Sequence, residues 1–90
     1  MRFTLVHLAY LMGQKLRGFR CAPSGIEFGP GLYARYDYNI GDVIVELNVN
    51  IQKLEGAMVG VGWFNCAVVN NSIVASINIK KGDEIIVGFL

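Results

Sequence analysis

The pattern of hydrophobic and polar positions changes once along the chain, at Gly18. Before this point apolar residues recur at helical spacing, and Thr4 stands where a helix cap is favoured. We therefore predict a short N-terminal helix that ends near Gly13, although residues 3–6 would also suit a strand. The apolar positions of this helix are Leu5, Leu8, Ala9, Met12 and Leu16.

After Gly18, short runs rich in Val and Ile alternate with Gly, Asn and Asp, which is typical of strands and turns. The chain is therefore predicted to be mainly β. The predicted strands are residues 19–22, 32–35, 43–49, 73–75 and 84–89, with turns at 39–42 and 80–83. Residues 57–65 are predicted to be either a strand or a turn of helix loosened by glycine.

The β region also contains an internal repeat. The segments LYARYDYNIGDVIV and IVASINIKKGDEIIV align Ala34 with Ala75, and each alanine precedes its Gly-Asp pair by 7 residues. Glycine accepts positive φ in such a turn, and aspartate accepts hydrogen bonds from nearby backbone N–H groups. We therefore predict two related β-units that pack as one compact body.

Composition narrows the classes of function. A single domain of 90 residues has a small core, yet 53% of its residues are hydrophobic and 17% charged, against roughly 45 to 50% and 25% in typical domains. No uninterrupted apolar run approaches the roughly 18 residues of a membrane-spanning helix, so no membrane partner is expected. We expect the surplus apolar surface to be covered by self-association or by another protein.

Charge and cysteine content suggest an intracellular protein that does not bind nucleic acid. The formal net charge is +1, and positive charge is concentrated only at Lys15, Arg17 and Arg20. Cys21 and Cys66 are expected to be buried thiols, with one disulfide between them as the alternative. One histidine and two distant cysteines predict no metal site.

Two ordered blocks resemble the signature of the SET domain, the β-clip fold of many protein-lysine methyltransferases. In PSGIEFGPGLYARYDYNIGDVIVEL, Gly29 and Gly31 match the family's Gly-x-Gly pair. In GWFNCAVVNNSIVASINIKKGDEIIVGF, Asn65 and Asn71 match the first and last asparagines of its Phe-Asn-His-Ser-Cys-x-Pro-Asn motif. The resemblance implies a minimal SET-like β-clip domain at residues 19–90, preceded by an N-terminal helical segment at 1–18.

The sequence departs from the family where methyl transfer takes place. Phe89 stands at the position of the family's final tyrosine, whose hydroxyl helps to orient the lysine amine, and Cys66 replaces its histidine. SET enzymes continue beyond that tyrosine, whereas this sequence ends at Leu90, and only about ten residues separate Asn50 from Gly60, where the family usually has substrate-recognising helices. We therefore expect no catalytic residue and a lysine channel that does not exclude water.

The resemblance assigns Gly29, Gly31 and Asn65 to S-adenosylmethionine, if cofactor binding is retained. The alternative is that Gly29 and Gly31 form a tight turn and Asn65 another, in which case the protein uses no cofactor. Asn71 is expected to satisfy buried backbone groups where the chain crosses itself. His7 is expected to bond a backbone carbonyl.

Other polar and aromatic side chains lead to two further expectations. The carboxylates of the turns, Asp42, Asp83 and Glu84, are expected to be solvated. Three tyrosines lie near the first turn: Tyr33, Tyr36 and Tyr38. We expect them either to form a contact surface or to divide between the two faces of one strand.

Together these features predict a compact, mainly β, SET-like β-clip domain with a short N-terminal helix. We expect a non-catalytic structural or interaction subunit, in a homo-oligomer or in a viral or phage assembly such as a particle shell. The alternative is an S-adenosylmethionine-dependent protein-lysine N-methyltransferase of reduced size.

Overall fold

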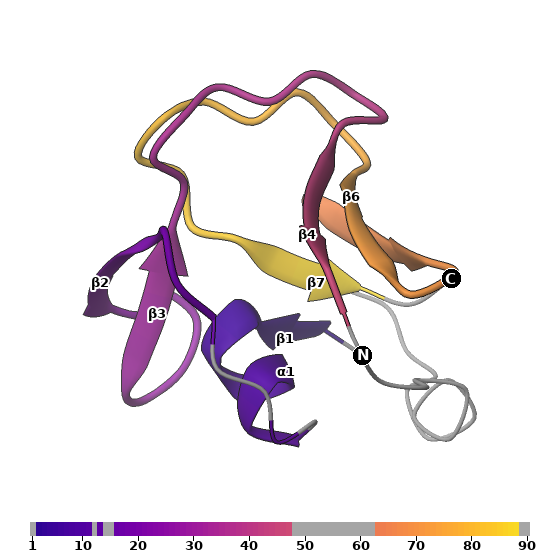
Figure 1. The fold of residues 1–90 in the computed structure, drawn as a ribbon. Coiled ribbons are helices and arrows are strands. Elements are labelled where there is room, and N and C mark those ends of the chain that lie inside the picture. The colour runs from indigo at the N-terminus through magenta and orange to yellow at the C-terminus, as the bar shows by residue number, and fades with distance from the viewer. Residues whose placement is uncertain (1, 12, 14–15, 48–62, 89–90) are drawn as a thin grey trace.

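The computed structural model describes residues 2–11, 13, 16–47 and 63–88. A five-stranded sheet has the strand order β1-β7-β5-β6-β4, and a smaller sheet pairs β2 with β3 (Figure 1). The prediction of a mainly β domain with a short N-terminal helix is confirmed. The elements are β1 (Arg2–Thr4), α1 (Leu5–Leu11), β2 (Arg20–Pro23), β3 (Pro30–Tyr33), β4 (Val43–Glu46), β5 (Cys66–Val69), β6 (Ser72–Ala75) and β7 (Ile86–Gly88).

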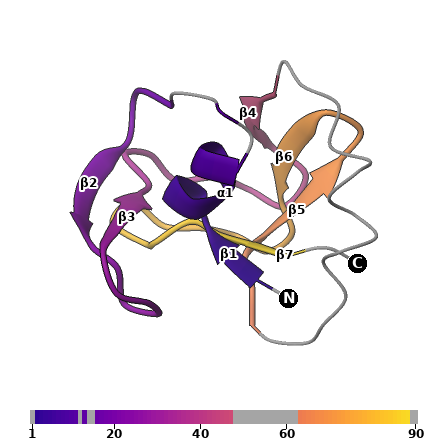
Figure 2. The same ribbon diagram turned by 90° about the horizontal axis from the view of Figure 1, so that it is seen from below.

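The N-terminal segment packs on its own domain. Strand β1 pairs antiparallel with β7, and α1 follows it directly, so the predicted helix is present and a short strand precedes it. Thr4 Oγ1 accepts a hydrogen bond of 3.0 Å from His7 N, which confirms the predicted cap. Leu5 and Leu8 are fully buried in the core. Seen from below, α1 lies between the β2–β3 hairpin and strands β4, β5 and β6 (Figure 2).

The core is built from both repeated units and from α1. Hydrophobic burial of this kind supplies most of the stability of a small domain. The first unit contributes Leu32 and Ala34 to the core. The largest fully buried apolar side chains come from α1 and from the second unit, and they are Leu5, Leu8, Ile73, Ile79, Ile85 and Val87.

The two predicted β-units pack together by exchanging equivalent backbone hydrogen bonds. Four bonds join the alanine of each unit to the Gly-Asp turn of the other: Ala34 N to Asp83 O at 2.8 Å, Gly82 N to Ala34 O at 2.9 Å, Ala75 N to Asp42 O at 2.9 Å, and Gly41 N to Ala75 O at 2.8 Å. Between them, Tyr38 and Ile79 exchange two bonds of 2.8 Å each. Figure 1 shows the two connections running side by side. The internal repeat therefore forms a local two-fold arrangement.

Each Gly-Asp turn is closed by its own aspartate. Asp42 Oδ2 accepts a hydrogen bond of 2.8 Å from Asn39 N, and Asp83 Oδ2 accepts one of 3.0 Å from Lys80 N. The glycine before each aspartate has a φ of 90° or 95°, a region that glycine adopts without steric cost. The predicted turns are confirmed, and their carboxylates bond the backbone besides facing solvent.

The observed strands differ from the predicted ones chiefly at their ends, and two were not predicted. The β3 strand begins at Pro30 rather than Leu32, and β7 begins at Ile86 rather than Glu84. One of the two unpredicted strands is β1, which overlaps residues 3–6, where a strand was only the alternative to the helix. The other is β5, which lies parallel to β7 and antiparallel to β6. Residues 63–65, the described end of the element predicted at 57–65, form neither a strand nor a helix. The predictions for residues 48–49, for 57–62 and for Phe89 lie outside the described residues.

Candidate functional site

Asn65, assigned to the cofactor by the SET resemblance, is buried beside the start of β7, with only 1% of its surface exposed. Its side-chain Nδ2 donates to Glu84 O at 2.7 Å, and its Oδ1 accepts from Ile86 N at 2.9 Å. Its backbone N also donates to Ile86 O at 3.1 Å. The side-chain amide of Asn65 therefore links the residue that precedes β5 to the backbone at the start of β7.

Gly31, the second glycine of the pair, lies in β3 against the side chain of Glu84. Glu84 Oε1 accepts a hydrogen bond of 2.9 Å from Gly25 N. A Cβ atom at Gly31 would overlap Glu84 Oε2, which is buried and accepts no hydrogen bond within the described part of the chain. The expectation that Glu84 is solvated is wrong, because the missing side chain at Gly31 leaves room for the carboxylate to enter.

This geometry does not fit S-adenosylmethionine at Gly31 and Asn65. The resemblance would place the cofactor against the backbone of the glycine pair and in contact with Asn65. Instead, the Glu84 carboxylate fills the space beside Gly31, and both polar atoms of the Asn65 amide bond the backbone of the protein itself. Phe89, at the position of the family's tyrosine, lies outside the described residues.

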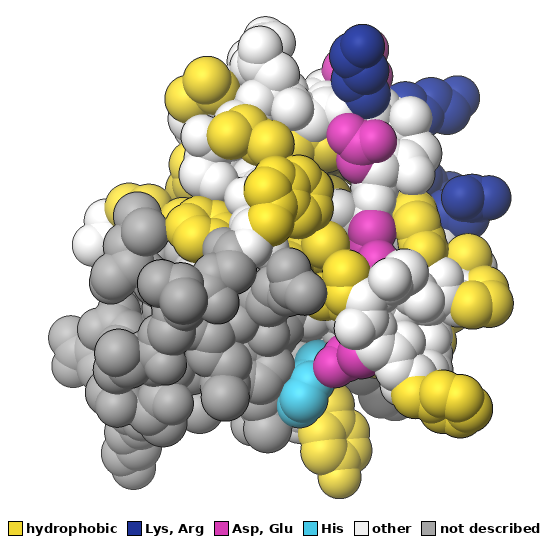
Figure 3. Space-filling view, turned by 180° about the vertical axis from the view of Figure 1, so that it is seen from behind, with side chains coloured by type: hydrophobic (Ala, Val, Ile, Leu, Met, Phe, Trp, Pro, Cys, Tyr) yellow, Lys and Arg dark blue, Asp and Glu magenta, His cyan; other side chains and the backbone are white. Residues whose placement is uncertain are grey.

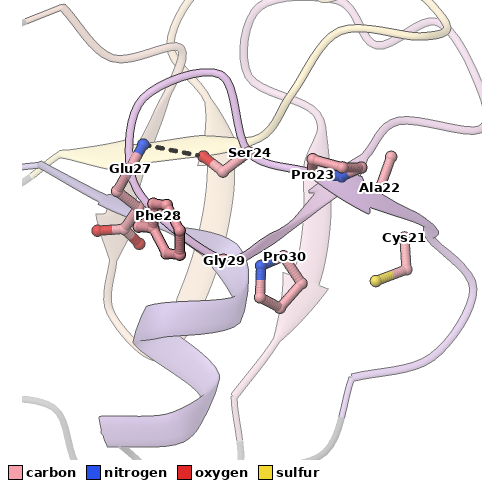
Figure 4. Close-up of a pocket in the computed structure, with 8 residues that line it drawn as sticks. All are labelled: Cys21, Ala22, Pro23, Ser24, Glu27, Phe28, Gly29 and Pro30. Atoms are coloured by element: carbon pink, nitrogen blue, oxygen red, sulfur yellow. Dashed lines mark hydrogen bonds between the residues drawn. The ribbon is translucent and has the colours of Figure 1, made fainter.

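Gly29 borders a surface hollow with a volume of about 520 Å³, called the larger hollow here in comparison with a second one at α1. The hollow lies along the turn that joins β2 to β3, and its walls are mainly apolar (Figure 4). Gly29 has a φ of 113°, which favours glycine at this point of the turn. The lining residues are Cys21, Ala22, Pro23, Ser24, Glu27, Phe28, Gly29 and Pro30.

Hydrogen bonds hold this turn in one shape. Ser24 Oγ accepts from Ile26 N at 3.1 Å and from Glu27 N at 3.3 Å, and Figure 4 shows the second of these bonds. Ser24 N donates to Gly29 O at 2.9 Å across the turn. Glu27 Oε1 in turn accepts a bond of 2.9 Å from Thr4 Oγ1. The turn is thus closed by its own hydrogen bonds and is also bonded to Thr4, the cap of α1.

A second hollow of about 370 Å³ lies between this turn and α1. His7 lines it, and His7 Nδ1 lies 3.4 Å from Glu27 Oε1. The His7 ring therefore has the Glu27 carboxylate as a neighbour, and the predicted bond to a backbone carbonyl stays a prediction. Three of the residues that line the second hollow belong to α1, and they are Val6, His7 and Tyr10. The other three are Glu27 and Phe28 from the turn and Pro30 at the start of β3.

Two aromatic rings project from this part of the surface. Phe28 is 108% exposed relative to a free reference residue, and Tyr10 is 83% exposed. Figure 3 shows large hydrophobic side chains projecting beside the histidine and a neighbouring carboxylate. Sequence analysis missed both rings, although the position of Phe28 inside a stretch rich in glycine and proline indicates a turn rather than a core.

The three tyrosines near the first turn do not form one surface. The Tyr33 hydroxyl donates to Pro23 O, and its ring lies 5.3 Å from the guanidinium carbon of Arg20. Tyr38 is half-buried in the bridge to Ile79, and burial raises its pKa. Tyr36 is exposed. Only Tyr33 lies in a strand, β3, whereas Tyr36 and Tyr38 lie in the connection between β3 and β4, so the alternative that places them on two faces of one strand is wrong.

Cys21 and Asn71 also differ from expectation, whereas Cys66 does not. Both thiols are free; Cys66 is buried as predicted, whereas the prediction is wrong for Cys21, which is exposed on a strand of the two-stranded sheet. Burial raises the pKa of Cys66 to about 12. Asn71 is exposed in the turn between β5 and β6, next to Asn70 with a φ of 55°. The structural role expected of Asn71 is carried by Asn65.

Further chemistry is limited within the described ranges. No three His, Cys, Asp or Glu side chains gather there as the ligands of a metal ion would. In the same part of the chain, no helix has the length and apolar character needed to cross a membrane. Comparison with protein-family models, with curated proteins and with solved structures finds no match. The SET resemblance therefore stays a prediction that rests on sequence motifs.

Proposed function

We propose that this chain is a non-catalytic, SET-like β-clip module that serves as a structural or interaction subunit by associating with copies of itself. The observation that carries the proposal is the exposure of Phe28 and Tyr10 on one face of a small domain. Fully exposed aromatic rings that border apolar hollows are typical of surfaces that bind a protein. A particle shell encoded by a virus or phage is one setting that suits such a module.

The positions of the sequence-predicted cofactor residues support a non-catalytic role. Asn65 uses its side chain to bond the backbone at Glu84 and Ile86, so replacing it by a ligand contact would leave two buried backbone groups without partners. The carboxylate of Glu84 fills the space beside Gly31 that a bound ligand would have to occupy. Both features stabilise the fold rather than provide a reaction centre.

Sedimentation velocity of the purified chain tests self-association. Over concentrations from about 10 µM to about 1 mM, dissociation constants in the micromolar range become visible as a shift in mean mass. We expect species heavier than the 9.9 kDa monomer to increase with concentration. A chain that keeps the monomer mass over this whole range would refute the proposed function.

One observation favours the alternative, a reduced S-adenosylmethionine-dependent protein-lysine methyltransferase. Gly29, the first glycine of the pair, lines the larger hollow, which is wide enough to admit a small molecule. Isothermal titration calorimetry with S-adenosylmethionine tests this alternative, and we expect no heat of binding at millimolar ligand. Micromolar binding would favour the enzyme over the structural module.

A further inference from the structure

The turn between β2 and β3 presents a projecting ring beside a hollow. Phe28 is fully exposed, and it stands between the two hollows because it lines both of them. Tyr10, on α1, borders the smaller hollow and is 83% exposed. We call this part of the surface, formed by Tyr10, Glu27, Phe28 and Pro30 together with the larger hollow, the Phe28 face.

The ring of Phe28 is held away from the core by the turn that carries it. The turn is closed by bonds from Ile26 N and Glu27 N to Ser24 Oγ, and by the bond between Ser24 N and Gly29 O. Two outside attachments add to these: Gly25 N donates to the Glu84 carboxylate and Thr4 Oγ1 to the Glu27 carboxylate. Because the backbone of the turn is already fixed by these bonds, a contact made through Phe28 loses little backbone conformational entropy.

A projecting ring and a hollow on the same face can complement a second copy of that face. In a two-fold contact the same patch is used by both subunits, so the ring of each copy enters the hollow of the other. The larger hollow has a volume of about 520 Å³, whereas an apolar cavity of about 150 Å³ already holds a benzene molecule. Its walls include Pro23 and Pro30, which offer apolar contact to an aromatic ring.

The area available agrees with what a stable dimer needs. A buried Phe or Tyr side chain removes about 150 to 250 Å² from water, so two rings from each copy would remove about 600 to 1,000 Å². Stable interfaces bury about 1,200 to 2,000 Å² in total. The rings would thus supply about half of such an interface, and Val6, Pro23 and Pro30 border the same hollows and can supply more.

We propose that the Phe28 face is a two-fold contact between two copies of this chain, in which each Phe28 ring occupies the larger hollow of the other copy. The proposal rests on the proposed self-association and adds the surface responsible for it. Glu27 is hydrogen-bonded to Thr4 and remains partly exposed, so its carboxylate lies at the rim of the contact.

Phe28→Ser tests the contact, with Tyr36→Ser as the matched control. Both residues are exposed aromatics, but Tyr36 lies in the connection between β3 and β4 and lines neither hollow. In sedimentation velocity we expect Phe28→Ser to raise the dimer dissociation constant at least 30-fold, as for a central interface residue, and Tyr36→Ser to leave it unchanged. Urea midpoints equal to that of the wild type, measured well below the dimer dissociation constant, would show that both variants fold.

The outcomes separate this proposal from the proposed function. Association of the wild type that survives Phe28→Ser would overturn the contact and leave self-association standing. A wild-type chain that stays monomeric would overturn both, and binding of a different partner by that monomer would not restore the contact.

A second measurement needs no substitution at the face. Cys21 lines the larger hollow, so the partner ring would cover it, while buried Cys66 serves as the internal control. We expect the alkylation rate of Cys21 to fall as the wild-type concentration rises through the dissociation constant. A rate that does not change with concentration would overturn the contact, even if Phe28→Ser fails to fold.

Discussion

Replacing Asn65 by leucine is expected to weaken the fold strongly while leaving its shape nearly unchanged. Leucine has the branching of asparagine but neither donates nor accepts a hydrogen bond. The change would leave Glu84 O and Ile86 N, which now bond the Asn65 amide, without these partners in a buried setting. Each unsatisfied buried group costs about 1 to 3 kcal/mol, so we expect a loss of about 2 to 6 kcal/mol.

This loss would be a large part of the total stability. A domain of 90 residues is typically stable by about 5 to 14 kcal/mol. Urea unfolding, followed by the fluorescence of the single tryptophan, Trp63, gives the free energy of unfolding by linear extrapolation. Asn71→Leu is the matched control, because Asn71 is exposed in a turn, and it should change the stability by less than about 0.5 kcal/mol.

Two results would refute the reasoning about Asn65. One is a loss below about 1 kcal/mol in Asn65→Leu, and the other is an equal loss in Asn71→Leu. Either would mean that the Asn65 amide is not needed by the fold and is available for another role, including the cofactor contact that the SET resemblance implies.

Two further predictions concern Gly31 and Cys66. Gly31→Ala should lower the free energy of unfolding by about 1 to 3 kcal/mol, because its Cβ would overlap the Glu84 carboxylate. Urea unfolding should show that Glu84→Ala in the same chain recovers part of this loss, whereas additive losses would contradict the contact. At pH 8, iodoacetamide should modify Cys21 in the folded protein and both thiols only in urea, as mass spectrometry can show; fast modification of folded Cys66 would contradict its burial. Burial raises the pKa of the Cys66 thiol from 9.0 to about 12, so the unfolded chain loses this proton at a lower pH than the folded chain. The stability that the protonated thiol contributes is therefore complete below pH 9 and falls as the pH rises from about 9 to 12. In this window the free energy of unfolding of Cys66→Ala in urea should depend less on pH than that of the wild type.

Local sequence signals predicted the parts of the fold that depend on neighbouring residues. Thr4 caps a helix because its hydroxyl reaches the N–H of His7, three positions along the chain. The Gly-Asp turns close through bonds between residues that are also three positions apart. The equal spacing of Ala34 and Ala75 from these turns predicted the packing of two equivalent units, and this packing is observed.

The parts that sequence reasoning missed depend on distant partners. Strand β1 forms because β7 lies beside it, and β5 forms between β7 and β6 without any alternation of polar and apolar residues. The burial of Glu84 depends on Gly25 and Gly31, which belong to the other half of the chain. Exposure of Phe28 follows from the attachments of its turn to Thr4 and Glu84, so composition alone did not indicate it.

The exchange of hydrogen bonds between the two β-units has a consequence for how fast the protein folds. Its contacts join residues far apart in sequence, such as Gly25 and Glu84, separated by 59 positions, and Asp37 and Lys81, separated by 44. Chains with such high contact order fold slowly, typically in milliseconds to seconds, because long loops must close before the contacts form. Neither unit has its full set of backbone partners until the other is in place, so we expect the two to form in a single cooperative transition, with no stable half-folded intermediate.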